Sequence, residues 1–287
     1  RLAAQASPCH DAGQRKRDKG TSRLMATFIS DGLTLAYDDI DPPSAERTIV
    51  LVHGFASNRN EGWRRTGWYG AFERRRVRCI ALDQRGHGES AKLHHPEAYT
   101  REKLAGDLVA LFDHLGLQSA DVFGYSMGTR TAMQMAIEAP ERISNLILGG
   151  IGERLFQPRP EGQGAGSMSM AEAMLADYTR RGFFDGIGLR LPTICVRPGK
   201  PNRAASSFFS AIIREPLAGR PATLPVSRDW VHTHASPRSA VGFFIHAATM
   251  DTEAIGFRRN LVMPGVAASV ADQIAALVRV GGQRAAD

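Results

Sequence analysis

Four short, largely apolar runs that alternate with helical segments constrain the fold of this chain more than any other feature. They occupy residues 48–53, 77–83, 120–125 and 145–150. Strands with nearly continuous apolar sequence are typical of parallel sheets that are covered on both faces. Their alternation with helical segments predicts a doubly wound, mostly parallel α/β sheet with helices on both faces.

The elements around these runs have recognisable local signals. Residues 26–37 predict a β-hairpin, because two apolar strands flank an Asp31-Gly32 turn. Residues 100–117 predict a helix, because leucines recur there at three- and four-residue spacing. Residues 127–139 predict a second helix that ends at a proline. Residues 168–181 also have helical composition.

The pattern divides the chain into four parts. Residues 1–24 lack apolar periodicity and are expected to be a disordered or non-native extension. Residues 25–151 carry the regular alternation and predict the N-terminal part of the core. Residues 152–190 are interpreted as a cap or linker. Residues 191–287 are interpreted as an irregular C-terminal part of the core, with a possible strand at 191–196.

Composition excludes several classes of protein. The 287 residues are 43% hydrophobic and 23% charged, which is enough apolar sequence for a buried core. No apolar run is long enough to span a membrane. Three cysteines are too few and too dispersed for a disulfide framework or a zinc site, which favours a reducing cytoplasm.

The net charge of +7 comes from the two ends of the chain, whereas residues 25–176 are net acidic. Basic ends can bind polyanions. However, no aromatic stacking platform or recognition helix accompanies them, so nucleic-acid binding is not expected. A polyanion-binding interaction protein remains an alternative that steep salt dependence would reveal.

The sharpest chemical feature is Gly124-Tyr125-Ser126-Met127-Gly128, which joins a predicted strand to a predicted helix. A serine at such a turn can present its hydroxyl above the sheet edge. Small residues on either side are needed because the strand and helix backbones nearly touch there.

Two further loops leave the carboxyl ends of predicted strands, where active sites of open parallel sheets lie. The first loop begins at His53-Gly54-Phe55, and the second spans residues 83–90. Within the second loop, Arg85 is expected to brace the backbone rather than to bind substrate.

Three motifs in this order, L-V-H-G-F (51–55), D-x-R-G-H-G-x-S (83–90) and G-Y-S-M-G (124–128), resemble the α/β-hydrolase superfamily. They are most similar to its small serine esterase, lactonase and perhydrolase-like members. The resemblance implies Ser126 as the nucleophile and the amides of Phe55 and Met127 as the oxyanion hole. It also implies a helical cap within 152–190, and structural roles for the histidines of the first two motifs. No metal or organic cofactor is implied.

The base and acid that a serine nucleophile needs are harder to assign. Candidate bases are His232, His234 and His246. His232 is chosen because it lies at about the expected distance after residues 191–196 and precedes a predicted helix at 239–247. His246 lies in an apolar run and is expected to be a packed core residue.

The acid has no clear candidate, because the residues that follow 191–196 include no carboxylate. Glu153 and Asp185 are the alternatives, and the acid could also be absent. A reading-frame shift near residues 177–180 would explain the irregular C-terminal part. That hypothesis predicts poor packing after this point and no complete triad.

The sequence therefore predicts a serine hydrolase of the esterase class (EC 3.1) that cleaves a small carboxylic ester, thioester or lactone through an acyl-enzyme on Ser126. The alternative is a catalytically impaired protein of the same fold that binds a small ligand. The substrate and the oligomeric state are left open.

Overall fold

The structure, a computed structural model, describes residues 23–150, 167–197, 205–256 and 258–283. Its main feature is an eight-stranded sheet in the spatial order β1-β2-β4-β3-β5-β6-β7-β10. β1 and β2 form an antiparallel hairpin, β2 is antiparallel to β4, and the remaining neighbours are parallel. The strands span Arg23–Ser30 (β1), Leu33–Ile40 (β2), Arg47–Val52 (β3), Val77–Leu82 (β4), Ala120–Tyr125 (β5), Ile143–Gly149 (β6), Asp185–Arg190 (β7) and Asn260–Val262 (β10).

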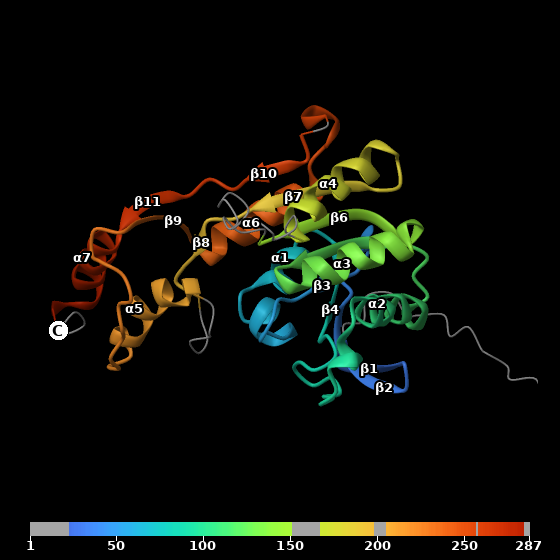
Figure 1. Cartoon of the computed structure of the whole chain (residues 1–287), viewed down its shortest axis with the longest axis horizontal. Helices are drawn as coiled ribbons and strands as arrows, with labels where there is room; N and C mark the ends of the chain where they lie inside the picture. The colour runs from blue at the N-terminus through green and yellow to red at the C-terminus, as the bar shows by residue number, and fades with distance from the viewer. Residues whose placement is uncertain (1–22, 151–166, 198–204, 257, 284–287) are drawn as a thin grey trace, which may run out of the picture.

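Helices cover both faces of this sheet, as predicted (Figure 1). One face packs against α2, α3 and α4 through an apolar cluster that includes Leu108, Met135 and Leu175. The other face packs against α1 and α6. These helices span Trp68–Glu73 (α1), Arg101–Leu115 (α2), Met127–Glu138 (α3), Ser167–Arg180 (α4) and Pro237–Thr249 (α6).

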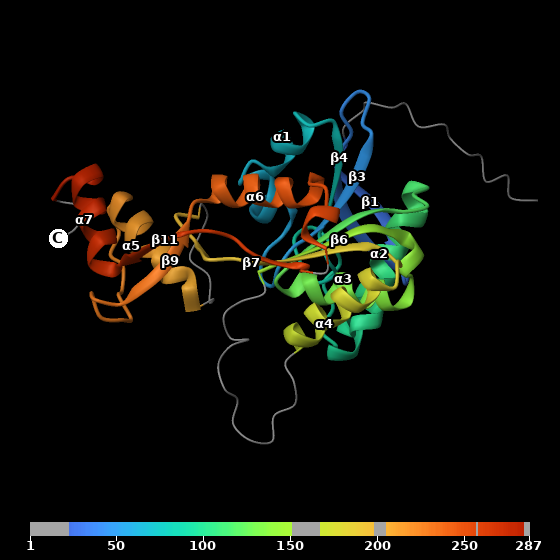
Figure 2. The same cartoon turned by 90° about the horizontal axis from the view of Figure 1, so that it is seen from above.

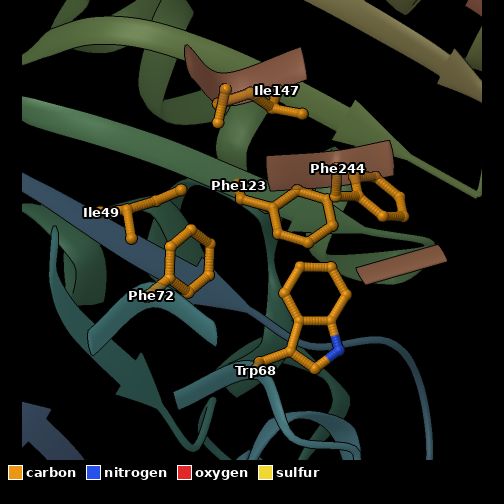
Figure 3. A pocket seen from close by; sticks show the side chains of 7 residues that line it. Ile49, Trp68, Phe72, Phe123, Ile147 and Phe244 are labelled. Atoms are coloured by element: carbon orange, nitrogen blue, oxygen red, sulfur yellow. The ribbon is translucent and has the colours of Figure 1, made fainter. Parts of the chain in front are cut away.

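An aromatic cluster connects α6 to the sheet. The Phe244 ring lies 4.5 Å from the Phe123 ring and 5.3 Å from the Trp68 ring, centroid to centroid. Figure 3 shows these three rings facing one another between the sheet and the helices. A Cβ on Gly149 would lie 2.6 Å from the Phe244 ring, so glycine on β6 allows this close contact. Part of the C-terminal segment therefore completes the main core.

The rest of the C-terminal segment forms a second lobe beside the main sheet (Figure 2). It contains a three-stranded sheet in the order β11-β9-β8 and two helices. These elements span Thr193–Ile194 (β8), Val231–Ala235 (β9), Val266–Ser269 (β11), Phe208–Leu217 (α5) and Val270–Gly281 (α7). The lobe has its own small apolar cluster, in which Phe209, Ile212 and Val270 are buried.

Several boundaries differ from the sequence analysis. β1 begins at Arg23, two residues before the predicted start of the fold. The possible strand at 191–196 shrinks to β8, which pairs with the second sheet. The described part of the predicted cap forms α4 and β7, which belong to the core layers. The helix predicted as the last one is α6, but α7 follows it. The frame shift near residues 177–180 stays a hypothesis.

Candidate active site

Ser126 occupies a sharp turn between β5 and α3. Its backbone has φ of +53° and ψ of −111°, a region that residues with a side chain rarely adopt. The Ser126 N–H donates to the Gly149 carbonyl at 2.8 Å, and its carbonyl accepts from the Thr129 N–H at 3.1 Å. The residue is exposed. This is the geometry of a nucleophile elbow, in which strain in the backbone presents a hydroxyl above the sheet edge.

Two glycines make this turn possible. A Cβ on Gly128 would lie 2.1 Å from the Val52 carbonyl oxygen. A Cβ on Gly124 would lie 2.5 Å from the Gly128 carbonyl oxygen. These oxygens are backbone atoms that cannot move without displacing β3 or α3. The close approach explains why the sequence has a glycine on each side of Tyr125-Ser126-Met127.

The two predicted oxyanion amides lie beside this serine. A Cβ on Gly54 would lie 3.2 Å from the Ser126 Cβ, so the loop after β3 contacts the elbow directly. Phe55 is the next residue of that loop, and Met127 is the first residue of α3. Neither amide donates a hydrogen bond to another residue in the described ranges. Free amides at this point can stabilise an oxyanion, and the α3 dipole adds to that effect.

His53 is part of the scaffold below this loop. Its Nδ1–H donates to the Gly54 carbonyl at 2.8 Å, and its Nε2 accepts from the Gln84 N–H at 3.1 Å. The Gln84 amide donates to the His53 carbonyl at 2.7 Å and accepts from the Thr131 hydroxyl at 2.7 Å. Burial is the main cause that lowers the pKa of His53 to about 4. A neutral, doubly hydrogen-bonded imidazole of this kind positions the loop and does not reach a substrate.

Buried ion pairs hold the second loop in place. The Arg85 guanidinium, 1% exposed, donates two hydrogen bonds of 2.7 Å to the Asp107 carboxylate and one of 2.8 Å to the Ala98 carbonyl. Arg59 pairs with Asp83 at the start of the loop. Arg85 therefore braces the backbone, as expected from the sequence.

His87 is the histidine in this loop that lies beside the oxyanion loop. Its ring lies 5.1 Å from the His53 ring and 6.1 Å from the Phe55 ring. Its Nδ1 lies 3.1 Å from the Arg85 carbonyl oxygen. The motif spacing had already pointed to this loop. Within the described ranges, however, no hydrogen bond joins His87 to Ser126.

The structure does not bring His232, the residue chosen as the base, to Ser126. His232 lies on β9 in the second sheet, where its ring packs against Phe209 at 5.0 Å, and β9 is well separated from α3 in both views. His234 lies on the same strand. His246 is on α6 but is exposed, contrary to the expected packed position. The base was assigned by its distance along the sequence from the possible strand at 191–196. In the structure that strand is β8, which belongs to the second sheet and not to the main one.

Of the two candidate acids, only Asp185 is among the described residues, and it does not lie at the site. Glu153 lies outside the described residues. Asp185 begins β7 opposite Asn145, whereas Tyr125 is level with Gly149 at the other end of the strands. Four residues along a strand separate these levels by about 13 Å. Asp185 is also paired with Arg259. At the carboxyl end of β7 stands Arg190, whose guanidinium binds the Glu172 carboxylate at 2.9 Å and 3.0 Å.

A polar cavity of about 230 Å³ lies at the amino edge of the sheet, on the side opposite Ser126. Its lining includes Arg47, Asn145 and Asp185. None of the described helices is both long and apolar enough to cross a bilayer.

Comparison with known proteins agrees with this geometry for the N-terminal part. Residues 47–179 match the model of the alpha/beta hydrolase fold family. The chain is also 34% identical over 123 residues to a putative 2-succinyl-6-hydroxy-2,4-cyclohexadiene-1-carboxylate synthase of Bacillus subtilis, an alignment that covers 42% of each protein. Together with the sheet order and the elbow, these matches show that the N-terminal part of the chain has the α/β-hydrolase fold.

Two other relatives are proteins of a different kind. The chain is 50% identical over 119 residues to D-erythronate dehydrogenase of Cupriavidus necator, an alignment that covers 42% of this chain and 37% of the dehydrogenase. A solved structure of a nucleoside-diphosphate-sugar epimerase from Agrobacterium tumefaciens is 30% identical with a TM-score of 0.59. That alignment covers 84% of this chain and 80% of the epimerase, so it must extend beyond residue 179. The chain thus spans well under half of the dehydrogenase and of the synthase.

Proposed function

We propose that this chain is a hydrolase-fold protein that binds small carboxylic esters, thioesters or lactones at Ser126 and is slowly acylated by them. The observation that carries the proposal is the exposed Ser126 at a positive φ beside two free amides. In the proposed step, the Ser126 Oγ bonds to the carbonyl carbon while the Phe55 and Met127 amides bind the oxyanion. The alcohol or thiol then leaves as the carbonyl re-forms.

The position of His232 in the second lobe sets the expected rate. Since no hydrogen bond joins a histidine to Ser126 within the described ranges, we expect water to take the Ser126 proton and later to attack the acyl group. Serine hydrolases that lose a triad member keep roughly 10³–10⁴-fold catalysis over water through binding and the oxyanion hole. We therefore expect slow acylation and an even slower hydrolysis of the acyl group. The proposed function therefore combines both predictions from the sequence, the serine esterase and the catalytically impaired protein of the same fold.

A fluorophosphonate probe tests the nucleophile without knowledge of the substrate. We expect slow labelling of the full chain that Ser126→Ala abolishes. Ser144→Ala removes an exposed serine of β6 and should leave labelling unchanged, as should His232→Ala. No labelling of the folded chain after prolonged exposure would contradict a nucleophilic Ser126. A large loss in His232→Ala would contradict the assignment of His232 to a separate lobe.

A second candidate function concerns the C-terminal segment. We infer that the similarity to D-erythronate dehydrogenase and the hydrolase match lie mostly in different parts of the chain; 119 aligned residues then lie mainly after residue 179, because they cannot fit into residues 1–46. Residues 180–287 offer a segment of nearly that length. The second lobe would then be a ligand-binding part related to these dehydrogenases. Such similarity also argues against a shifted reading frame.

Thermal unfolding of the full chain with D-erythronate tests this second candidate. A ligand that binds the folded state stabilises it by RT ln(1 + L/Kd), where L is the free ligand concentration, so the transition temperature rises with the logarithm of that concentration once it exceeds Kd. We expect D-erythronate to raise it and succinate, a carboxylate without hydroxyl groups, to leave it unchanged. Equal effects of the two compounds would indicate a nonspecific anion effect and would contradict the candidate.

A further inference from the structure

Three side chains with complementary chemistry form a row in the second lobe. The Cys195 Sγ lies 3.6 Å from the His234 Nδ1. On the other side of the ring, the His234 Nε2 lies 2.8 Å from the Gln273 amide nitrogen, Nε2. A thiol, an imidazole and a third polar group in this order are the parts of an activated nucleophile. This row is separate from Ser126 and does not depend on the function proposed for it.

The backbone holds the row in place. His234 on β9 is paired with Thr193 of β8 on one side and with Val266 of β11 on the other. The Cys195 N–H extends this ladder by donating to the Ala235 carbonyl at 2.9 Å. Gln273 lies in the first turn of α7, whose start is fixed by a capping box between Ser269 and Asp272. Three elements therefore converge on one ring.

The surroundings keep the pair neutral. His234 is 8% exposed, and the Phe209 ring packs edge-on against it at 4.8 Å. Burial is the main cause that lowers the pKa of His234, and the neighbouring His232 adds to this effect. Burial also raises the pKa of the Cys195 thiol, against a smaller opposing effect of Arg197. Near pH 7 the row is thus a protonated thiol facing a neutral imidazole.

The orientation of the Gln273 amide determines which nitrogen of the His234 ring carries the proton. Its Oε1 is buried without a hydrogen-bond partner among the described residues. Amide oxygen and nitrogen can exchange places by rotation about one bond. With Oε1 turned toward His234, it accepts the Nε2–H, and Nδ1 is free to accept the thiol proton. That orientation gives the oxygen a donor, places the amide nitrogen where the oxygen had been, and makes the imidazole a base.

We propose that Cys195 is a nucleophilic modification site for small, uncharged α,β-unsaturated carbonyl compounds, with His234 as its base and Gln273 as the positioning residue. The sulfur bonds to the β-carbon while the C=C π electrons form an enolate. The thiol proton passes to the His234 Nδ1 and then to the α-carbon, which regenerates the neutral imidazole. No group leaves and no oxidant is needed. The aromatic and neutral surroundings favour a soft, uncharged electrophile over a charged one.

N-ethylmaleimide, itself such a compound, tests the site in the full chain. The measurement is the rate of Cys195 labelling near pH 7, followed by mass spectrometry of its peptide in a Cys9→Ser background. We expect His234→Asn to slow labelling at least tenfold, since general-base assistance contributes factors of this size or larger. His246→Asn is the control, because this histidine is exposed on α6 and does not belong to the row, and it should leave the rate unchanged.

Cys79, which is fully buried on β4, reports whether the main sheet of each variant is folded, and amide hydrogen exchange in β9 and α7 reports whether the second lobe is folded. An unchanged Cys195 rate in His234→Asn with Cys79 protected would overturn the proposal. If His234→Asn exposes Cys79, two variants of Gln273 test the proposal instead. Gln273→Leu should slow labelling, and Gln273→Glu, which restores an acceptor for the Nε2–H, should recover the rate. Equal rates in both Gln273 variants and the parent would also overturn it.

Discussion

Ser126 shows how much a single residue depends on its neighbours. A non-glycine residue at φ of +53° costs free energy, typically about 1–3 kcal/mol, unless the surrounding structure enforces it. Here the enforcing contacts are the Ser126 hydrogen bond to Gly149 and the close backbone approach at Gly124 and Gly128. The strain is thus located at the residue whose exposure the proposed chemistry needs.

Replacing Gly128 by alanine should disrupt the elbow. The added methyl group would lie 2.1 Å from the Val52 carbonyl oxygen, so α3 or β3 must shift. We expect a loss of about 3 kcal/mol or more in unfolding free energy, as for other severe overpacking. Urea unfolding measures this change. Gly106→Ala on α2 is the control, since a Cβ there meets no atom within 4 Å and alanine favours a helix. Equal stability of the two variants would contradict the account.

His53 should make stability depend on pH. Its pKa in the folded chain, about 4, is below the ordinary value of 6.5, so the unfolded chain binds more protons between these values. Stability is therefore fully present above pH 6.5 and is lost as the pH falls toward 4. The expected loss from pH 7 to pH 5 is about 2 kcal/mol. Urea unfolding should show that His53→Gln removes this dependence, whereas His94→Gln, on an exposed loop, should retain it.

At the scale of elements, the sequence predicted the first half of the fold well. The turn at Asp31 and Gly32 forms with positive φ at both residues, which is the geometry that such a hairpin prefers. The helix predicted for 100–117 ends at Gly116 with φ of +64°. These signals are local, so the chain around each residue suffices to predict them.

The later elements could not be predicted in the same way. β8 has two residues and gains its place only by pairing with β9, a contact between segments about 40 residues apart. His232 was therefore assigned by its distance along the chain, although its position is set by strand pairing. The Asp185 error has the same cause, because only the register shows at which end of β7 it lies.

Phe244 should contribute strongly to the main core from its place on α6. Its ring packs on Phe123 and Trp68 and is 3% exposed. We expect Phe244→Ala to lower the unfolding free energy by about 3–5 kcal/mol. Phe183→Ala, which truncates a 43% exposed ring, should cost less than about 1 kcal/mol. Denaturant titrations of both variants provide the comparison, and similar losses would show that α6 does not support the sheet.

At the scale of the whole molecule, the main sheet and the second lobe have apolar cores of unequal size. The eight-stranded sheet is packed on both faces by extensive clusters, whereas among the described residues the apolar cluster of the second lobe buries Phe209, Ile212 and Val270 alone. The proposed nucleophiles, Ser126 and Cys195, belong to different lobes. The chain therefore combines two sites that do not share residues.

The second lobe should open more readily than the main sheet. A smaller core stabilises its hydrogen bonds less, so local unfolding costs less free energy there. Hydrogen exchange followed by mass spectrometry should show faster amide exchange in β9, β11 and α7 than in β3, β5 and β6. Exchange of all six elements at one common rate would instead indicate a single cooperative unit.

The central claim is that Ser126 is built to accept an acyl group although His232 does not serve it. The most direct measurement is mass spectrometry of the chain after exposure to p-nitrophenyl acetate. We expect one acetyl group to accumulate on the Ser126 peptide, in the parent and in His232→Ala alike, and to be absent from Ser126→Ala. Rapid turnover that requires His232, or an acetyl group that never appears on Ser126, would contradict the account.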